Sequence, residues 1–174
     1  MAVRPIVVVP HEALTTPAVV IKTIDDRIRT LAKEMAQAMY RAPGIGLAAN
    51  QVGELCRLIV VDVQYAYAVP QEKKKEPIFI INPVISLAEG NCVKEEGCLS
   101  VPDFAVEIKR AEVVQVTGLD LEGNPITIEA DGMLARALQH EVDHLNGKTI
   151  LERASSLKRN LYRRKLRKAD RRDR

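Results

Sequence analysis

The sequence predicts an α+β domain built on antiparallel β-sheets. An amphipathic helical segment is followed by several short apolar strands, then by a strongly apolar helix and a basic tail, and this order of elements is typical of the α+β class. The chain has 174 residues, of which 47% are hydrophobic. This size and composition are sufficient for one domain with a sizeable core.

Residues 23–44 predict the first helix. Apolar side chains recur there at the spacing of one helix face, at Ile24, Ile28, Leu31, Met35 and Met39. Thr23 and Asp26 have the spacing of a capping box at the helix start, and Pro43-Gly44 is a signal that ends a helix.

Two apolar runs in the middle of the chain predict buried strands. They span 57–63 and 77–85, and Asn82-Pro83 interrupts the second. The segment 64–77 between them is polar and rich in lysine, so we expect an exposed hairpin or a longer surface loop there.

A β-hairpin is predicted further along the chain. The runs 106–120 and 125–131 are alternating or apolar, and the turn-like Glu122-Gly123-Asn124 joins them. The preceding segment 95–103 is interpreted as a polar turn and a loop that contains a proline.

The segment 131–147 predicts a buried helix. Asp131 is its candidate N-cap and Asn146-Gly147 its candidate end. Apolar residues cover most of its circumference, which is typical of a helix enclosed by other elements.

The end of the chain is strongly basic. A second helix is expected to begin at Ser155 or Ser156, with a thin apolar stripe made of Leu157, Leu161 and Leu166. No linker or internal repeat is visible. Residues 156–174 are therefore expected to be a basic helix or tail appended to a domain at 1–155, and not a second domain.

Composition restricts the classes of function. No apolar run approaches the roughly 18 residues that a membrane span needs. Three cysteines are an odd number, which favours a reducing compartment and a cytoplasmic protein over a disulfide scaffold. Aromatic residues make up only 3% of the chain, which argues against base stacking and sequence-specific binding of nucleic acid.

The motif HExxH in the apolar helix is the strongest chemical signal. His140 and His144 are one helical turn apart, so both imidazoles can reach one metal ion. Glu141 follows His140 and is displaced from it by about 100° around the helix axis. It is therefore poorly placed to be a metal ligand but well placed to exchange a proton with a metal-bound water. Two histidines satisfied by backbone carbonyls are the structural alternative.

Two ligands do not make a metal site, so a third must come from elsewhere. In the metalloprotease pattern HExxHxxGxxH, Gly147 matches the glycine, but Ile150 stands in place of the last histidine. Glu152 is too close to act as the glutamate of the related protease class. The cysteines remain as donors. Cys98 follows a polar turn and precedes a loop with a proline, so its thiolate could be presented; Cys56 adjoins an apolar strand and is expected to be a core thiol, and Cys92 stays open. A His₂Cys set with an open position suits a catalytic site and admits iron as well as zinc.

Three segments in order resemble the peptide deformylases. The family pattern GxGxAAxQ stands here at Gly44–Gln51, EGCLS at Glu96–Ser100 and QHExDH at Gln139–His144. The resemblance extends from about residue 5 to about residue 155. It implies a fold in which antiparallel sheets pack around a central helix that carries HExxH, with the basic helix appended.

The resemblance also implies an activity and the residues that perform it. The activity is removal of the formyl group from the N-terminal formyl-methionine of nascent polypeptides, which releases formate after metal-bound hydroxide attacks the formyl carbon. One metal ion, usually Fe²⁺ with Zn²⁺, Ni²⁺ or Co²⁺ as substitutes, would be held by Cys98, His140 and His144. Glu141 would be general base and acid, and Gln51 with the backbone N–H of Leu99 would bind the oxyanion. The implied substrate-binding residues are Ile45, Gly46, Leu47 and Gly97.

Some positions depart from the family pattern. Arg136 stands where deformylases often carry an apolar residue, so it would either line the methionine pocket or point to solvent. Asp103-Phe104-Ala105 lacks an arginine that some bacterial members have there. In some bacterial deformylases a basic C-terminal helix docks on the ribosome, and residues 157–174 have a compatible composition.

Two other classes of function are alternatives to a deformylase. A metallopeptidase would need a third histidine or glutamate near the helix, and would cleave internal peptide bonds. In a non-catalytic module, the basic tail would contact nucleic acid and HExxH would be only structural; the aromatic content of 3% argues against base stacking in such a module.

Overall fold

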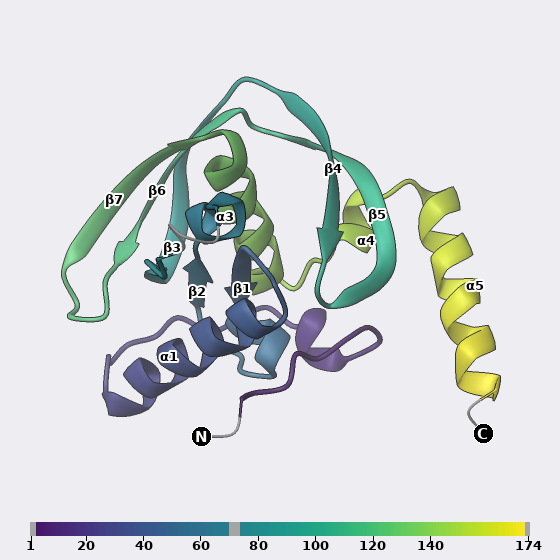
Figure 1. Cartoon of the computed structure of the whole chain (residues 1–174), viewed down its shortest axis with the longest axis horizontal. Coiled ribbons are helices and arrows are strands. Elements are labelled where there is room, and N and C mark those ends of the chain that lie inside the picture. Colours follow the sequence, from purple (N-terminus) through teal and green to yellow (C-terminus); the bar gives the residue numbers. More distant parts are fainter. Residues whose placement is uncertain (1–2, 70–73, 173–174) are drawn as a thin grey trace.

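The computed structural model describes residues 3–69 and 74–172 and has two antiparallel sheets (Figure 1). Five strands pair in the order β1-β2-β3-β6-β7, and β4 pairs with β5 in a separate sheet. This arrangement confirms the α+β class with antiparallel sheets. The strands are β1 Gly46–Ala48, β2 Leu58–Val61, β3 Ile78–Glu89, β4 Cys92–Cys98, β5 Val101–Arg110, β6 Val113–Leu119 and β7 Pro125–Asp131. The helices are η1 Glu12–Leu14, α1 Asp26–Arg41, η2 Ala49–Val52, α2 Val63–Tyr67, α3 Gly132–Leu145, α4 Ile150–Arg153 and α5 Ser156–Arg172.

The five-stranded sheet is covered by a helix on each face. Successive side chains of a strand point to opposite faces, and β2 follows this rule. Leu58 and Val60 pack with residues of α1, whereas Ile59 and Val61 pack with residues of α3. All four are fully buried, which explains why this strand is apolar at every position.

Helix α3 lies between the two sheets, with the large sheet on one side and β4–β5 toward the other (Figure 1). Its apolar side chains pack on β2, β3 and β6. Two hydrogen bonds fix it to the start of the turn between β5 and β6: the side chain of Gln139 accepts from the backbone N–H of Ala111 and donates to its carbonyl. Asn146 and Gly147, the latter at φ +70°, follow the helix where the sequence predicts its end.

The first helix is confirmed, but its predicted cap is wrong. Helix α1 begins at Asp26, and the side chain of Asp25 caps it by accepting from the backbone N–H of Ile28. The spacing of Thr23 and Asp26 places the cap two residues earlier, at Thr23, and only the extended backbone at Asp25 decides that Asp25 is the N-cap. At the start of α3, Asp131 occupies the N-cap position but makes no side-chain capping hydrogen bond.

The predicted β6–β7 hairpin is confirmed, but two neighbouring predictions are wrong. Residues 92–98 form strand β4, although the segment around Cys98 was interpreted as a polar turn. The run 106–120 is not one strand, because it leaves β5 of the small sheet at Arg110 and enters β6 of the large sheet at Val113. Apolar alternation continues across this boundary and so conceals the change of sheet.

Strand β3 continues through the interruption predicted at Asn82-Pro83. Asn82 has φ +52°, and the pairing register with β6 shifts between Ile81 and Val84. The side chain of Asn82 also bonds both backbone groups of Ile21, which ties the N-terminal segment to the sheet.

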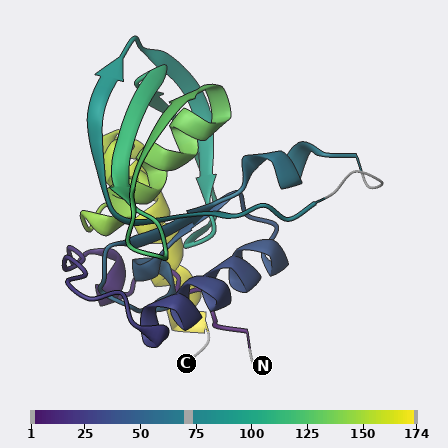
Figure 2. The same cartoon turned by 90° about the vertical axis from the view of Figure 1, so that its left-hand side faces the viewer.

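The polar segment after β2 begins with the short helix α2 and projects from the body of the molecule (Figure 2). A turn of helix replaces the start of the loop that the sequence predicts. Residues 70–73, in the middle of that predicted loop, lie outside the described residues.

Helix α5 packs on β5 through a face that the sequence did not predict. Leu157 is 68% exposed and Leu161 is 54% exposed, so the predicted stripe is wrong at these two positions. The contact instead uses Tyr162, which is buried, packs against Phe104 with the two rings tilted, and donates a hydrogen bond to the carbonyl of Pro102. In the part of the chain that the structure describes, no helix combines the length and the apolar character that crossing a bilayer requires.

Candidate metal centre and active site

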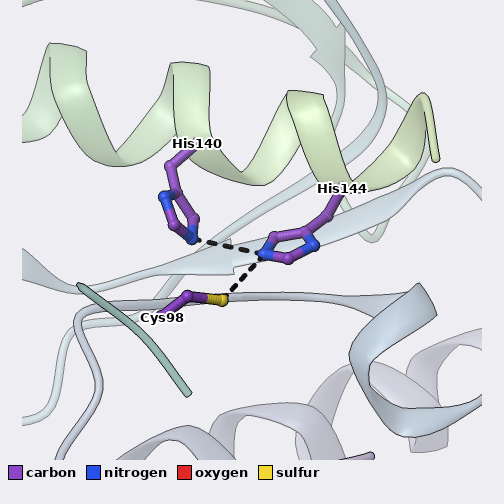
Figure 3. A group of neighbouring side chains, drawn as sticks. All are labelled: Cys98, His140 and His144. Carbon is purple, nitrogen blue, oxygen red and sulfur yellow. Dashed lines mark hydrogen bonds between the residues drawn. The ribbon is translucent and has the colours of Figure 1, made fainter. Parts of the chain in front are cut away.

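Cys98, His140 and His144 meet in one place (Figure 3). The two histidines project from successive turns of α3, and Cys98 ends strand β4. His144 Nε2 lies 3.2 Å from His140 Nε2 and 3.2 Å from Cys98 Sγ. Three donors from two separate elements therefore converge on one small volume.

The donor set suits a divalent transition metal. Two imidazole nitrogens at about 2.0–2.1 Å from a tetrahedral ion lie about 3.3–3.4 Å apart, which is close to the separation of the two Nε2 atoms. Thiolate and imidazole are ligands that zinc and iron accept. Burial, together with the neighbouring His140, lowers the pKa of His144 and favours the neutral ring that binds a metal.

Glu96 orients His140 from the side away from the metal site. Its Oε2 lies 3.1 Å from Nδ1 of His140, which leaves Nε2 free to face Cys98 and His144. Arg110 donates to both carboxylate oxygens of Glu96 at 3.0 Å. Burial alone would raise the pKa of Glu96, but the hydrogen bonds from His140 and Arg110 lower it to about 2. Glu96 is therefore a carboxylate at every pH near neutrality.

Glu141 stands beside this cluster as a buried acid. It is 3% exposed, and its Oε2 has no hydrogen-bond partner among the described residues. Burial raises its pKa to about 7, so the carboxyl can take up and release a proton near neutrality. Gly46 lies against it so closely that an added Cβ would be 2.5 Å from Oε1. A glycine at this position thus makes room for the acid.

Gln51 points its amide nitrogen into the same site. Its Oε1 accepts a 2.9 Å hydrogen bond from the backbone N–H of Ala48, which sets the orientation of the amide. Nε2 lies 3.2 Å from Oγ of Ser100 and 3.7 Å from Sγ of Cys98. One end of the amide thus holds its own loop, while the other end faces Cys98.

A cleft of about 750 Å³ opens over these residues. Its size is within the range of about 300–1,000 Å³ that is usual for ligand sites. Of the sequence-predicted residues, Ile45, Gly46, Gln51, Gly97, Cys98, Leu99, His140 and Glu141 line it. Leu47 does not, because its side chain is buried in the core against α1; only its backbone could meet a substrate.

Arg136 lines the cleft instead of pointing to solvent. Its side chain is 10% exposed, and its guanidinium turns inward to Oε1 of Glu96 at 2.7 Å. Of the two orientations that the sequence left open, the structure has the one that faces the pocket.

Several residues of the site were missed by the sequence interpretation. Arg110 and Asp143 form a buried ion pair behind the histidines, and Arg153 binds Asp143 from the surface side. Ser100 holds Gln51. The sequence does carry one signal for these residues, because acidic side chains buried on an apolar helix require charged partners. It does not indicate which arginines are those partners.

The remaining cysteines and histidine lie outside the cluster. Cys56 is partly buried against the core, and burial raises its pKa to about 11, which agrees with the prediction of a core thiol. Cys92 begins β4, at the opposite end of the strand from Cys98. His11 caps the short helix η1.

Comparison with known proteins gives a consistent result. Residues 3–160 match the family model described as polypeptide deformylase. The chain is 46% identical over 169 residues to the peptide deformylase of Desulfosudis oleivorans, covering 97% of this chain and 95% of that one. It is 48% identical over 165 residues to the peptide deformylase of Thermodesulfovibrio yellowstonii, covering 95% and 97%. The crystal structure of a peptide deformylase from Legionella pneumophila superposes with a TM-score of 0.87 at 44% identity, covering 98% and 96%.

Proposed function

Because the chain belongs to the polypeptide deformylase family and is a hydrolase of that kind, we propose that it removes the formyl group of N-terminal formyl-methionine by metal-dependent hydrolysis. The observation that carries the proposal is the meeting of Cys98, His140 and His144 at the floor of a cleft that Cys98, His140 and Glu141 line. Helix α3 is then the central helix that carries the catalytic motif. Residues 1–155 are the catalytic domain, which acts in the cytoplasm on newly made chains.

One ion per chain would be held by Cys98, His140 and His144, with Fe²⁺ as the native metal and Zn²⁺, Ni²⁺ or Co²⁺ as substitutes. When bound, such an ion lowers the pKa of a coordinated water and polarises the formyl oxygen. The thiolate of Cys98 contributes one negative charge to the site. Glu96 binds Nδ1 of His140 and so keeps the Nε2 atom of that ring turned toward the metal position.

Glu141 would carry the proton of the reaction. Its Oε2 has no partner among the described residues and lies in a water-poor position, where a hydrogen bond to a reacting water would be its main interaction. It takes the proton of the attacking water and later gives it to the departing amine. The acid therefore returns to its starting state in each cycle.

Gln51 and the backbone N–H of Leu99 would stabilise the negative charge that develops on the formyl oxygen. The amide of Gln51 is already held by Ala48 and Ser100, so it does not need to reorganise during the reaction. Leu99 stands in the tight turn between β4 and β5, one residue after the cysteine ligand. Loss of one such donor typically lowers the rate about 10²–10³-fold.

The strand topology supports binding of an extended peptide. Within the sheets that the described residues form, β1 is an edge strand, and β4 pairs only with β5. Residues of both strands line the cleft, so a peptide laid between them could hydrogen-bond to each edge. In this mode Ile45, Gly46 and Leu47 contact one side of the substrate backbone and Gly97 the other.

The basic segment 156–174 would be an extension of this domain that contacts the ribosome. Arg163, Arg164, Arg167 and Lys168 are all exposed on α5. Truncation would be a poor test, because Tyr162 supports Phe104, which lines the cleft. Replacing these four residues by glutamine instead is expected to weaken salt-sensitive association with ribosomes and to leave turnover of free peptide unchanged. Undiminished association would remove this part of the proposal.

The decisive test combines metal analysis with two assays on one formylated peptide. Protein purified without oxygen should contain about one metal ion per chain and release formate, without releasing internal amino acids as a metallopeptidase would. Cys98→Ser should lose metal and activity together. Glu141→Ala should keep the metal and lose nearly all turnover, and substantial turnover by this variant would contradict the mechanism.

A further inference from the structure

Arg136 occupies an unusual position between the cleft and the buried carboxylate of Glu96. It belongs to α3, one helical turn before His140, and two turns before His144. Side chains four residues apart lie on the same helix face, so Arg136, His140 and His144 form one row. Arg136 is one of the residues that line the cleft, and its guanidinium donates to the carboxylate of Glu96.

The Glu96 carboxylate receives four donors, and two of them come from successive turns of α3. Oε1 accepts from Nε of Arg110 at 3.0 Å and from Nη1 of Arg136 at 2.7 Å. Oε2 accepts from Nη2 of Arg110 at 3.0 Å and faces Nδ1 of His140 at 3.1 Å. Arg136 and His140 are the residues of α3 that contact Glu96 directly, whereas Arg110, from β5, links Glu96 to α3 indirectly by also binding Asp143.

This arrangement has a consequence for the metal ligands, because Glu96 precedes Cys98 by two residues on β4. Cys98 supplies the thiolate from β4, and both histidines project from α3. The separation between thiolate and imidazoles is therefore set by how β4 and α3 are held together. The pair Arg136–Glu96 fastens the two elements next to the ligands, with both side chains at most 10% exposed.

We propose that Arg136 is a positioning residue of the metal centre, which fixes Glu96 and thereby the spacing between Cys98 and the two histidines. This inference rests on the proposed function, since it assumes that these three residues bind a metal. It assigns Arg136 no contact with the reacting atoms. An arginine suits the role because its fork is planar: Nη1 binds Glu96 while Nη2 lies 3.5 Å from the carbonyl of Cys92, also on β4.

The test measures metal binding by metal-free protein, so it does not depend on activity. Zn²⁺ affinity is determined by competition with a chelator, and the visible spectrum of the Co²⁺ form reports the geometry around the thiolate. The variants are Arg136→Leu, which keeps an apolar wall but loses the fork, and Arg136→Lys, which keeps the charge. Lys109→Met is the matched control, because it removes one positive charge from an exposed position on β5.

Arg136→Leu is expected to lower metal affinity about 10–100-fold, the usual effect of removing a residue that supports a metal ligand. Its Co²⁺ spectrum should also change. Arg136→Lys should restore part of the affinity, and Lys109→Met should change it by no more than about twofold. At saturating metal, kcat of Arg136→Leu should fall more than KM changes.

Wild-type affinity and an unaltered Co²⁺ spectrum in Arg136→Leu would overturn the inference, as would an equal loss in Lys109→Met. If Arg136→Leu does not fold, Arg136→Lys provides the test. A metal affinity equal to that of wild type in this variant would overturn the inference, because it would show that a positive charge suffices without the planar guanidinium. A wild-type chain that bound no metal through Cys98 would instead refute the proposed function.

Discussion

Replacing Gly46 with alanine is expected to lower turnover by about two orders of magnitude, although it adds only one methyl group. The added Cβ would lie 2.5 Å from Oε1 of Glu141 and 3.0 Å from its Cδ and Cγ. Ordinary contact begins near 3.4 Å, so the carboxylate must move by about 0.9 Å, the difference from 2.5 Å. The backbone at Gly46 is not left-handed, so this effect is one of space and not of strain.

Glu141 cannot easily accommodate this displacement. The side chain is 3% exposed and belongs to the enclosed helix α3. Overpacking of this kind typically costs about 1–3 kcal/mol of stability. A displacement of about 1 Å of a catalytic group can cost about 10²-fold in rate, which is the basis of the expected loss.

The assay is formate release from a formyl-methionyl peptide, normalised to bound metal, with thermal unfolding measured in parallel. Gly118→Ala is the matched control. Its Cβ would lie 2.6 Å from Cγ2 of Ile80 and 2.8 Å from the backbone oxygen of Ile81 in the sheet core, so it should lose at least as much stability while keeping turnover per metal ion. Near-wild-type turnover in Gly46→Ala, or equal losses in both variants, would refute the reasoning about Glu141.

Three further predictions follow from buried groups. Arg110→Met leaves Glu96 and Asp143 without their shared cation, so the free energy of unfolding in urea should fall by about 3–5 kcal/mol; a loss below about 1 kcal/mol would contradict the role of this ion pair. Burial raises the pKa of Cys56 from 9.0 to about 11. The stability that this protonated thiol contributes to the folded state is therefore fully present below pH 9 and is lost as the pH rises toward 11. The Tm of Cys56→Ala should therefore fall less than the Tm of wild type between pH 9 and pH 11. Parallel curves of Tm against pH for the two proteins would contradict this prediction. Tyr162→Ala removes the ring contact with Phe104 and the hydrogen bond to Pro102, so limited proteolysis should show that trypsin cleaves within α5 faster than in wild type.

Local patterns predicted the elements whose signals lie within one segment. The apolar spacing of residues 23–44 indicated α1, and the turn at 122–124 indicated the β6–β7 hairpin, because both patterns depend on neighbours in the sequence. Strand β4 was missed because its polar and glycine-containing sequence resembles a turn, and only pairing with β5 makes it a strand. The cap of α1 was predicted two residues too early, at Thr23, because the spacing of Thr23 and Asp26 fits a capping box locally, whereas the folded backbone makes Asp25 the N-cap.

The sequence by itself determined which chemical groups this protein has: two histidines one turn apart, an acid beside them, and a cysteine and a glutamine in recognisable motifs. It could not decide how these groups are held. Glu96 meets His140 across 44 positions of sequence and Arg136 across 40, so both contacts exist only after β4 has packed beside α3. Periodicity reports neighbours within a few residues, whereas the orientation of Arg136 and the spacing of the three metal ligands depend on how two distant elements pack together.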